Sequence, residues 1–230
     1  MISKKKYILY SFAAVSLLYI LSSVFSVREI ELLTKPLFLP ILLYYYLRKT
    51  NSKSEIHTII CFIAFYIGEM LVLKDPEGFY LLSLVFFLIP YLVLLYYVTN
   101  DLLLIIKNYT LSKFAFFFFL VLLFLILLFV SVILTINTDD IIEKIILYLY
   151  GLSLILFGIM TVILYVYKNS KTNFFLLMMV IAFIISDMYF IFMKKIDYNW
   201  VFKLVNLVTQ IFSYYFFVNY SILRTKKNNV

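Results

Sequence analysis

Two short stretches of the sequence each place one carboxylate inside an otherwise apolar run. IAFYIGEM at Ile63–Met70 contains Glu69, and IAFIISDM at Ile181–Met188 contains Asp187. Two carboxyls that lie close together in a low-dielectric site cannot both ionise readily, so one is expected to hold a proton at neutral pH. Such a pair would supply a general acid and a general base, and either residue fits either role.

The composition places both acids in a membrane. The 230 residues are 65% hydrophobic and 14% charged, whereas soluble domains are roughly 45 to 50% apolar and about 25% charged. A helix of about 20 apolar residues can cross a bilayer. We predict an all-α fold, a polytopic membrane helix bundle of about eight transmembrane helices that form a single domain over residues 1–230. The predicted spans are residues 7 to 27, 30 to 47, 56 to 73, 79 to 99, 114 to 136, 142 to 167, 173 to 193 and 200 to 223.

The basic residues predict the orientation of the bundle. With the N-terminus in the cytoplasm, the predicted spans put 13 of the 20 Lys and Arg residues on the inner side, as the positive-inside rule requires of short loops. These are Lys4, Lys5, Lys6, Arg48, Lys49, Lys53, Lys107, Lys113, Lys168, Lys171, Arg224, Lys226 and Lys227. Both termini are basic and the span count is even, which agrees with cytoplasmic N- and C-termini. The net charge of +8 is then an orientation signal, and we expect no nucleic-acid partner.

The two carboxylate stretches belong to a longer internal similarity. They are offset by 118 residues, and the same offset aligns NSK at Asn51–Lys53 with Asn169–Lys171, and the pair Tyr96–Tyr97 with Tyr214–Tyr215. This register predicts two parallel four-helix halves, with an internal repeat of residues 1–112 and 113–230. Chance similarity between apolar segments is the alternative explanation.

The same two stretches predict that both acids point into the bundle at one depth. Glu69 and Asp187 lie five and seven residues before the next lysine, which places both about 7 to 10 Å below the outer interface at about 1.5 Å per residue. Each follows a pair of small residues that lets helices approach closely. A buried carboxylate needs a partner, and the candidates in this layer are Lys35, Lys203, Asn206 and Gln210. A purely structural salt bridge or hydrogen-bond network is the alternative to a functional site.

These residues also carry a resemblance to a known family. LTKPLFLPILL at Leu33–Leu43, IGEMLVL at Ile67–Leu73 and IAFIISDM, in this order in an eight-span chain, are similar to the lysoplasmalogenase (YhhN-like) integral membrane family. The resemblance implies hydrolysis of the vinyl ether bond of lysoplasmalogens, which releases a fatty aldehyde and a glycerophospho-head-group. The family's motif positions correspond here to Lys35 and Pro36, Gly68 and Glu69, and Ser186 and Asp187.

The chain departs from the family pattern at three places. Glu69 stands where the family has an aspartate, and the place of a family histidine in span 4 falls near Pro90 and Tyr91. The glutamine expected after the paired tyrosines of the last span is also absent, and Gln210 lies about two turns earlier.

The predicted function is therefore a membrane hydrolase for lysoplasmalogen-type lysophospholipids, with Glu69 and Asp187 as the catalytic pair. Lys35 or Lys203 would hold the substrate phosphate, and the remaining substrate-binding candidates are Ser186, Asn206 and Gln210. The expected partners are the lysophospholipid, water and membrane lipid, and the resemblance implies a bacterial cytoplasmic membrane. We expect no cofactor and no metal, because the chain has one His, one Cys and no glycine-rich phosphate loop.

Two other classes of function fit the same residues. Buried acids in parallel repeats also suit a proton-coupled or lipid transporter, and a catalytically silent relative would bind lipid or a partner. The chain has only four glycines, whereas a carrier with broken helices is expected to show more interruptions at mid-membrane. This observation favours a fixed bundle.

Overall fold

The computed structural model describes residues 4–51, 54–106, 115–135, 140–195 and 199–228. Within these ranges helices are the only regular secondary structure. They are α1 (Lys4–Val24), α2 (Arg28–Lys49), α3 (Ile56–Lys74), α4 (Tyr80–Ile106), α5 (Ala115–Thr135), α6 (Ile141–Tyr167), α7 (Lys171–Lys195) and α8 (Trp200–Asn228). Apolar runs of this length form helices because a helix satisfies its backbone hydrogen bonds within one segment, which hydrocarbon demands.

The predicted all-α membrane bundle is confirmed. Over the described residues, seven helices are long and apolar enough to cross a membrane, namely all except α5. α5 occupies Ala115–Thr135, and the two end residues of the span predicted over 114 to 136 lie outside the described ranges. So do Ser52 and Lys53 of the NSK match, and Lys107 and Lys113 of the basic set.

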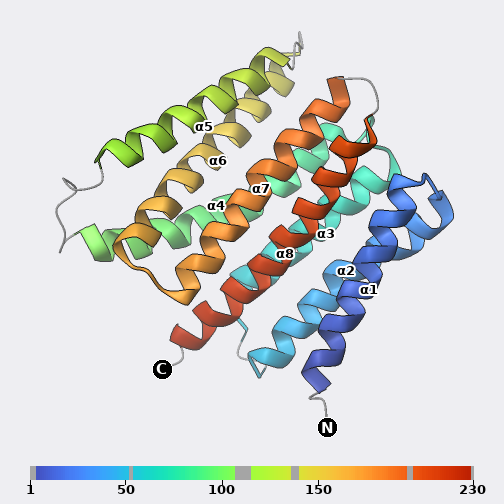
Figure 1. The fold of residues 1–230 in the computed structure, drawn as a ribbon, viewed down its shortest axis with the longest axis horizontal. Helices are drawn as coiled ribbons and strands as arrows, with labels where there is room; N and C mark the ends of the chain where they lie inside the picture. The colour runs from blue at the N-terminus through green and yellow to red at the C-terminus, as the bar shows by residue number, and fades with distance from the viewer. Residues whose placement is uncertain (1–3, 52–53, 107–114, 136–139, 196–198, 229–230) are drawn as a thin grey trace.

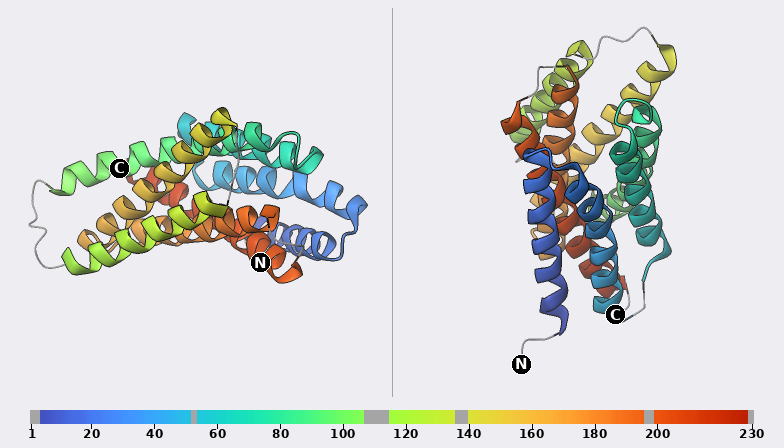
Figure 2. Two further views of the ribbon diagram at one scale, coloured as in Figure 1. Left: turned by 90° about the horizontal axis from the view of Figure 1, so that it is seen from above. Right: turned by 90° about the vertical axis from the view of Figure 1, so that its right-hand side faces the viewer.

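The helices pack in close pairs, and two of these pairs enclose the carboxylates. α7 packs closely along α8, α3 along α4, α1 along α2, and α4 along α6. Figure 1 shows α7 and α8 in front of α3 and α4, with α1 and α2 at one side and α5 and α6 at the other. Both termini lie at the same end of the bundle (Figures 1 and 2). The space between the α3–α4 pair and the α7–α8 pair is filled mainly by side chains, and the candidate site lies there.

An aromatic cluster at the centre of the bundle holds these helices in register. The ring of Phe65, on α3, is fully buried and lies 5.3 Å from Phe183 on α7 and 5.1 Å from Tyr214 on α8. It also lies 6.3 Å from Tyr91 on α4, measured between ring centroids. Phe65 is four residues before Glu69, so the two side chains share one face of α3. The cluster therefore aims Glu69 at the space between the helix pairs.

Two helices extend beyond the ends of the predicted spans, and an ion pair joins the two extensions. The spans predicted to end at 99 and 223 continue to Ile106 in α4 and to Asn228 in α8. Arg224 Nη1 lies 2.6 Å from Asp101 Oδ2, and the guanidinium lies 4.1 Å from the centre of the Tyr97 ring. The sequence interpretation treated these charges as breaks, but in the structure they pair with each other and both helices continue past them.

Candidate active site

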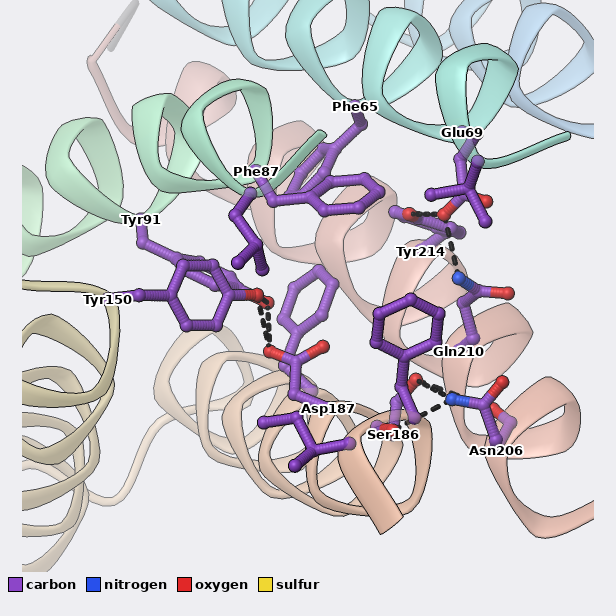
Figure 3. A pocket seen from close by; sticks show the side chains of 15 residues that line it. Phe65, Glu69, Phe87, Tyr91, Tyr150, Ser186, Asp187, Asn206, Gln210 and Tyr214 are labelled. Atoms are coloured by element: carbon purple, nitrogen blue, oxygen red, sulfur yellow. Dashed lines mark hydrogen bonds between the residues drawn. The ribbon is translucent and has the colours of Figure 1, made fainter. Parts of the chain in front are cut away.

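Glu69 is a buried carboxylate with both oxygens occupied. Its side chain is 1% exposed, and Oε2 lies 3.1 Å from Lys35 Nζ, which reaches it from α2. Oε1 accepts hydrogen bonds from Gln210 Nε2 at 2.7 Å and from the Tyr214 hydroxyl at 2.5 Å, both on α8 (Figure 3). The charge of Glu69 is therefore compensated by one cation and two neutral donors.

Lys35 has a second contact besides Glu69. Its ammonium lies 5.7 Å from the centre of the Tyr19 ring of α1, and its side chain is 6% exposed. A cation in this position is attracted by the negative face of the ring. Lys35 thus links α1, α2 and α3 at the back of the site, and it does not line the cavity described below.

Asp187, on α7, has a different set of partners. Its Oδ2 accepts hydrogen bonds from the Tyr91 hydroxyl of α4 at 2.8 Å and from the Tyr150 hydroxyl of α6 at 2.7 Å. Among the described residues, no Lys, Arg or His lies within 4.0 Å of its carboxylate, and no donor is bonded to Oδ1. In Figure 3 this second oxygen faces the side of the cavity where Glu69 and Gln210 lie. Asp187 therefore presents one free carboxyl oxygen.

A further polar contact joins α7, which carries Asp187, to α8, which carries the Gln210 and Tyr214 partners of Glu69. Asn206 Nδ2, on α8, donates to the Ser186 carbonyl at 2.7 Å, and the Ser186 hydroxyl lies 3.4 Å from the Asn206 carbonyl. Ser186 precedes Asp187, and Asn206 lies one turn before Gln210. The contact therefore fixes the register of α7 against α8 and sets the position of Asp187 relative to the Glu69 network.

Both carboxylates line one cavity between the helix pairs. It is small, with about 30 Å³ of room for water-sized molecules, enough for one or two waters beside the carboxylates. Its polar lining consists of Glu69, Tyr91, Tyr150, Ser186, Asp187, Asn206, Gln210 and Tyr214. The rest of the lining is apolar or aromatic, and Gly68 adjoins it, where a Cβ would lie 2.6 Å from Phe87. Polar groups and apolar wall together suit an amphipathic ligand.

The structure brings most of the predicted site residues together. Glu69 and Asp187 share the cavity, and so do Ser186, Asn206 and Gln210. Lys203 is placed elsewhere. Its Nζ donates to the Ser23 carbonyl near the end of α1 at 2.5 Å, and it does not line the cavity. Neither Lys35 nor Lys203 thus presents its ammonium to the cavity as a phosphate ligand would.

Three tyrosines in the site were not predicted. Tyr214 lies four residues after Gln210, on the same face of α8, so the helical spacing was a usable signal. Tyr91 stands near the place of the family's histidine and supplies a hydrogen-bond donor there. Tyr150 carries no signal in the sequence, because its contact with Asp187 depends on how α6 packs against α4 and α7.

Comparisons with known proteins do not identify a family or a function for the chain. No family model matches the chain, and no curated protein and no solved structure matches it. The resemblance to the lysoplasmalogenase family therefore consists of the short motifs alone. Over the part of the chain that the structure describes, no group of three or more His, Cys, Asp or Glu is placed to hold a metal ion.

Proposed function

We propose that the protein is a membrane hydrolase that cleaves the vinyl ether bond of lysoplasmalogen-type lysophospholipids. The observation that carries the proposal is the pair of carboxylates on one intramembrane cavity, each in a different electrostatic environment. Intramembrane ionisable groups mark functional sites by default. Two carboxyls with different environments are the usual basis for dividing acid and base roles.

Asp187 is the proposed general acid. It lacks a cationic partner among the described residues, both phenols bond to Oδ2, and Oδ1 is open to the cavity. In the proposed reaction Asp187 transfers its proton from Oδ1 to the alkene carbon that is not bonded to the ether oxygen, which leaves an oxocarbenium ion at the carbon that is. Water then adds to that ion and returns a proton to the Asp187 carboxylate. The resulting hemiacetal collapses to a fatty aldehyde and an alcohol, so the acid is regenerated and the atoms balance.

Glu69 is the proposed counter-charge for the oxocarbenium ion. Both of its oxygens are engaged by Lys35, Gln210 and Tyr214, but Glu69 lines the cavity and Lys35 does not, so the cavity faces the negative end of this ion pair. A preorganised charge in a low-dielectric site stabilises opposite charge that develops during the reaction. This division of roles goes beyond a symmetric acid–base pair, because one residue handles the proton and the other the charge.

The proposed substrate enters from the lipid side. The apolar part of the cavity lining, including Leu84, Phe87 and Ile191, suits the hydrocarbon next to the ether bond. The cavity as it stands has room for one or two waters only, so in this proposal the helix pairs separate to let a single-chain lipid place that bond among the polar groups while its head group stays near the interface. We further propose a bacterial cytoplasmic membrane with both termini in the cytoplasm, supported by the positive-inside pattern and by the position of both termini at one end.

Aldehyde release by the purified protein in detergent tests the proposal. Matched alkenyl and acyl lysophospholipids are the substrates, and Asp187→Asn is the main variant. We expect aldehyde from the alkenyl lipid only, and a decrease of about 10² to 10⁴-fold in kcat for Asp187→Asn. Glu29→Gln, which changes an exposed acid of α2 outside the cavity, is the matched control and should retain full activity. No aldehyde from folded wild-type protein, or full activity in Asp187→Asn, would overturn the proposal.

A further inference from the structure

A second polar cavity lies at the end of the bundle that carries both termini. It is bounded by the last turns of α4, α6 and α8 and by the first turn of α7, and it has about 140 Å³ of room for water-sized molecules. Arg224, in its lining, is 14 residues after Gln210 on α8, so the two cavities are about 20 Å apart along the helix axis. It is thus a separate site, near one membrane interface.

The lining of this cavity carries an excess of positive charge. Lys168, Arg224 and Lys227 face a single acid, Asp101. Lys168 and Lys227 are exposed at the mouth of the cavity, whereas Arg224 lies deeper, with its side chain 12% exposed. An excess of cations around a cavity attracts anions. Three cations in one lining stand out in a chain with only 14% charged residues.

Arg224 is held with donor groups to spare. Its Nη1 lies 2.6 Å from Asp101 Oδ2 and 3.2 Å from the Tyr220 hydroxyl, and its guanidinium stacks on the Tyr97 ring. Its Nε is buried and has no hydrogen-bond partner, and Nη2 bonds to no described residue. A rigid guanidinium with unused N–H groups is preorganised for an oxyanion, because arginine recognises phosphate through two parallel hydrogen bonds.

The surroundings of the cavity indicate that the anion belongs to a lipid. Leu104 and Ile105 of α4 and Leu164 of α6 also line it, and Leu104 is 69% exposed on the outer surface of the bundle. Thr172 adds a hydroxyl at the start of α7. Polar and cationic groups beside the exposed Leu104 and the half-buried Ile105 match a phosphate head group with attached acyl chains.

We propose that this cavity binds the phosphate group of an anionic phospholipid from the leaflet at the end with both termini. Arg224 is the fixed ligand of the phosphate, and Lys168 and Lys227 complete its neutralisation. The site is independent of the proposed hydrolase activity, because it shares no residue with the carboxylate cavity.

The test uses the purified full-length protein in neutral detergent. The probes are dihexanoyl phosphatidic acid, dihexanoyl phosphatidylcholine and inorganic phosphate, and binding is measured by calorimetric titration. The Lys168→Gln/Lys227→Gln double variant removes the two exposed cations of the cavity. Lys171→Gln/Lys226→Gln is its matched control, because both of these lysines are exposed at the same end and neither lines the cavity.

We expect saturable binding of phosphatidic acid, weakened about tenfold or more by Lys168→Gln/Lys227→Gln and less than about twofold by the control. Phosphatidylcholine, whose head group has no net charge, should bind at least about tenfold more weakly than phosphatidic acid. Competition with inorganic phosphate distinguishes the source of the anion, since displacement indicates a general phosphate site and persistence indicates a lipid site. Equal weakening in both double variants, or no saturable binding of phosphatidic acid, would overturn the proposal.

Discussion

Glu69 and Asp187 come from two similar stretches of sequence, yet they sit in opposite environments. Glu69 is paired with Lys35 and accepts from Gln210 and Tyr214, so both of its oxygens are occupied. Asp187 accepts from two phenols on one oxygen and leaves the other open to the cavity. The difference shows that neighbouring helices, and not the local motif, set the chemistry of each carboxylate.

The largest expected effect is a difference in stability between variants of the two acids. Glu69→Gln leaves the Lys35 charge buried without a partner and should lower the free energy of unfolding by about 3 to 5 kcal/mol. Asp187→Asn keeps a carbonyl oxygen that can accept from both phenols, so we expect a loss of about 1 kcal/mol or less. Unfolding of both variants in titrations with denaturing detergent measures the two values.

A charge-neutral double variant checks the reason for this difference. Lys35→Met/Glu69→Gln removes both charges, so it should be more stable than Glu69→Gln alone. If the double variant loses as much stability as Glu69→Gln, or if Asp187→Asn is the more damaging single change, the contrast between a paired and an unpaired carboxylate is wrong.

An intermediate effect compares one phenol from each network. Tyr214→Phe removes a hydrogen bond to a carboxylate that is paired with a cation, and it should cost about 1.5 to 3 kcal/mol. Tyr150→Phe removes a hydrogen bond to the proposed protonated acid, and about 0.5 to 1.5 kcal/mol is expected. The same unfolding titration gives both numbers. A Tyr150→Phe loss equal to that of Tyr214→Phe would mean that Asp187 is ionised, and it would contradict its role as the acid.

The smallest expected effect on stability and activity is that of Lys203, a lysine that is not a partner of either carboxylate. Lys203 donates to the Ser23 carbonyl and does not line the cavity. Lys203→Gln keeps an N–H donor for the Ser23 carbonyl, so it should lower the free energy of unfolding by about 1 kcal/mol or less and leave the KM for a lysophospholipid within about twofold. A clear rise in KM would show that Lys203 reaches the substrate head group, as the sequence suggested.

Most of the helix ends could be predicted from the sequence. Charged or turn-forming breaks such as KDPEG at Lys74–Gly78 separate the apolar runs, and the structure ends α3 at Lys74. The misplaced ends of α4 and α8 share one cause. Asp101 and Arg224 are 123 residues apart in the chain, and a pattern within one span cannot report that two such charges neutralise each other.

Part of the candidate site could also be predicted from the sequence. A lone acid in an apolar run must be compensated, and this requirement alone identified Glu69 and Asp187 and suggested Lys35 and Gln210 as partners. It could not rank the candidates. Lys203 met the same criteria of depth and charge as Lys35, but only Lys35 lies on a helix face that reaches Glu69.

The order of apolar runs and the isolated acids were enough to establish a membrane bundle and to single out the two candidate carboxylates, because burial in hydrocarbon is a property of composition and length. Which acid is paired with a cation and which accepts from phenols alone depends on the crossing of α2, α4, α6 and α8 around the cavity. Tyr150 reaches Asp187 across 37 residues of chain, and Tyr214 reaches Glu69 across 145. Contacts of that kind follow from packing between helices, and no local spacing encodes them.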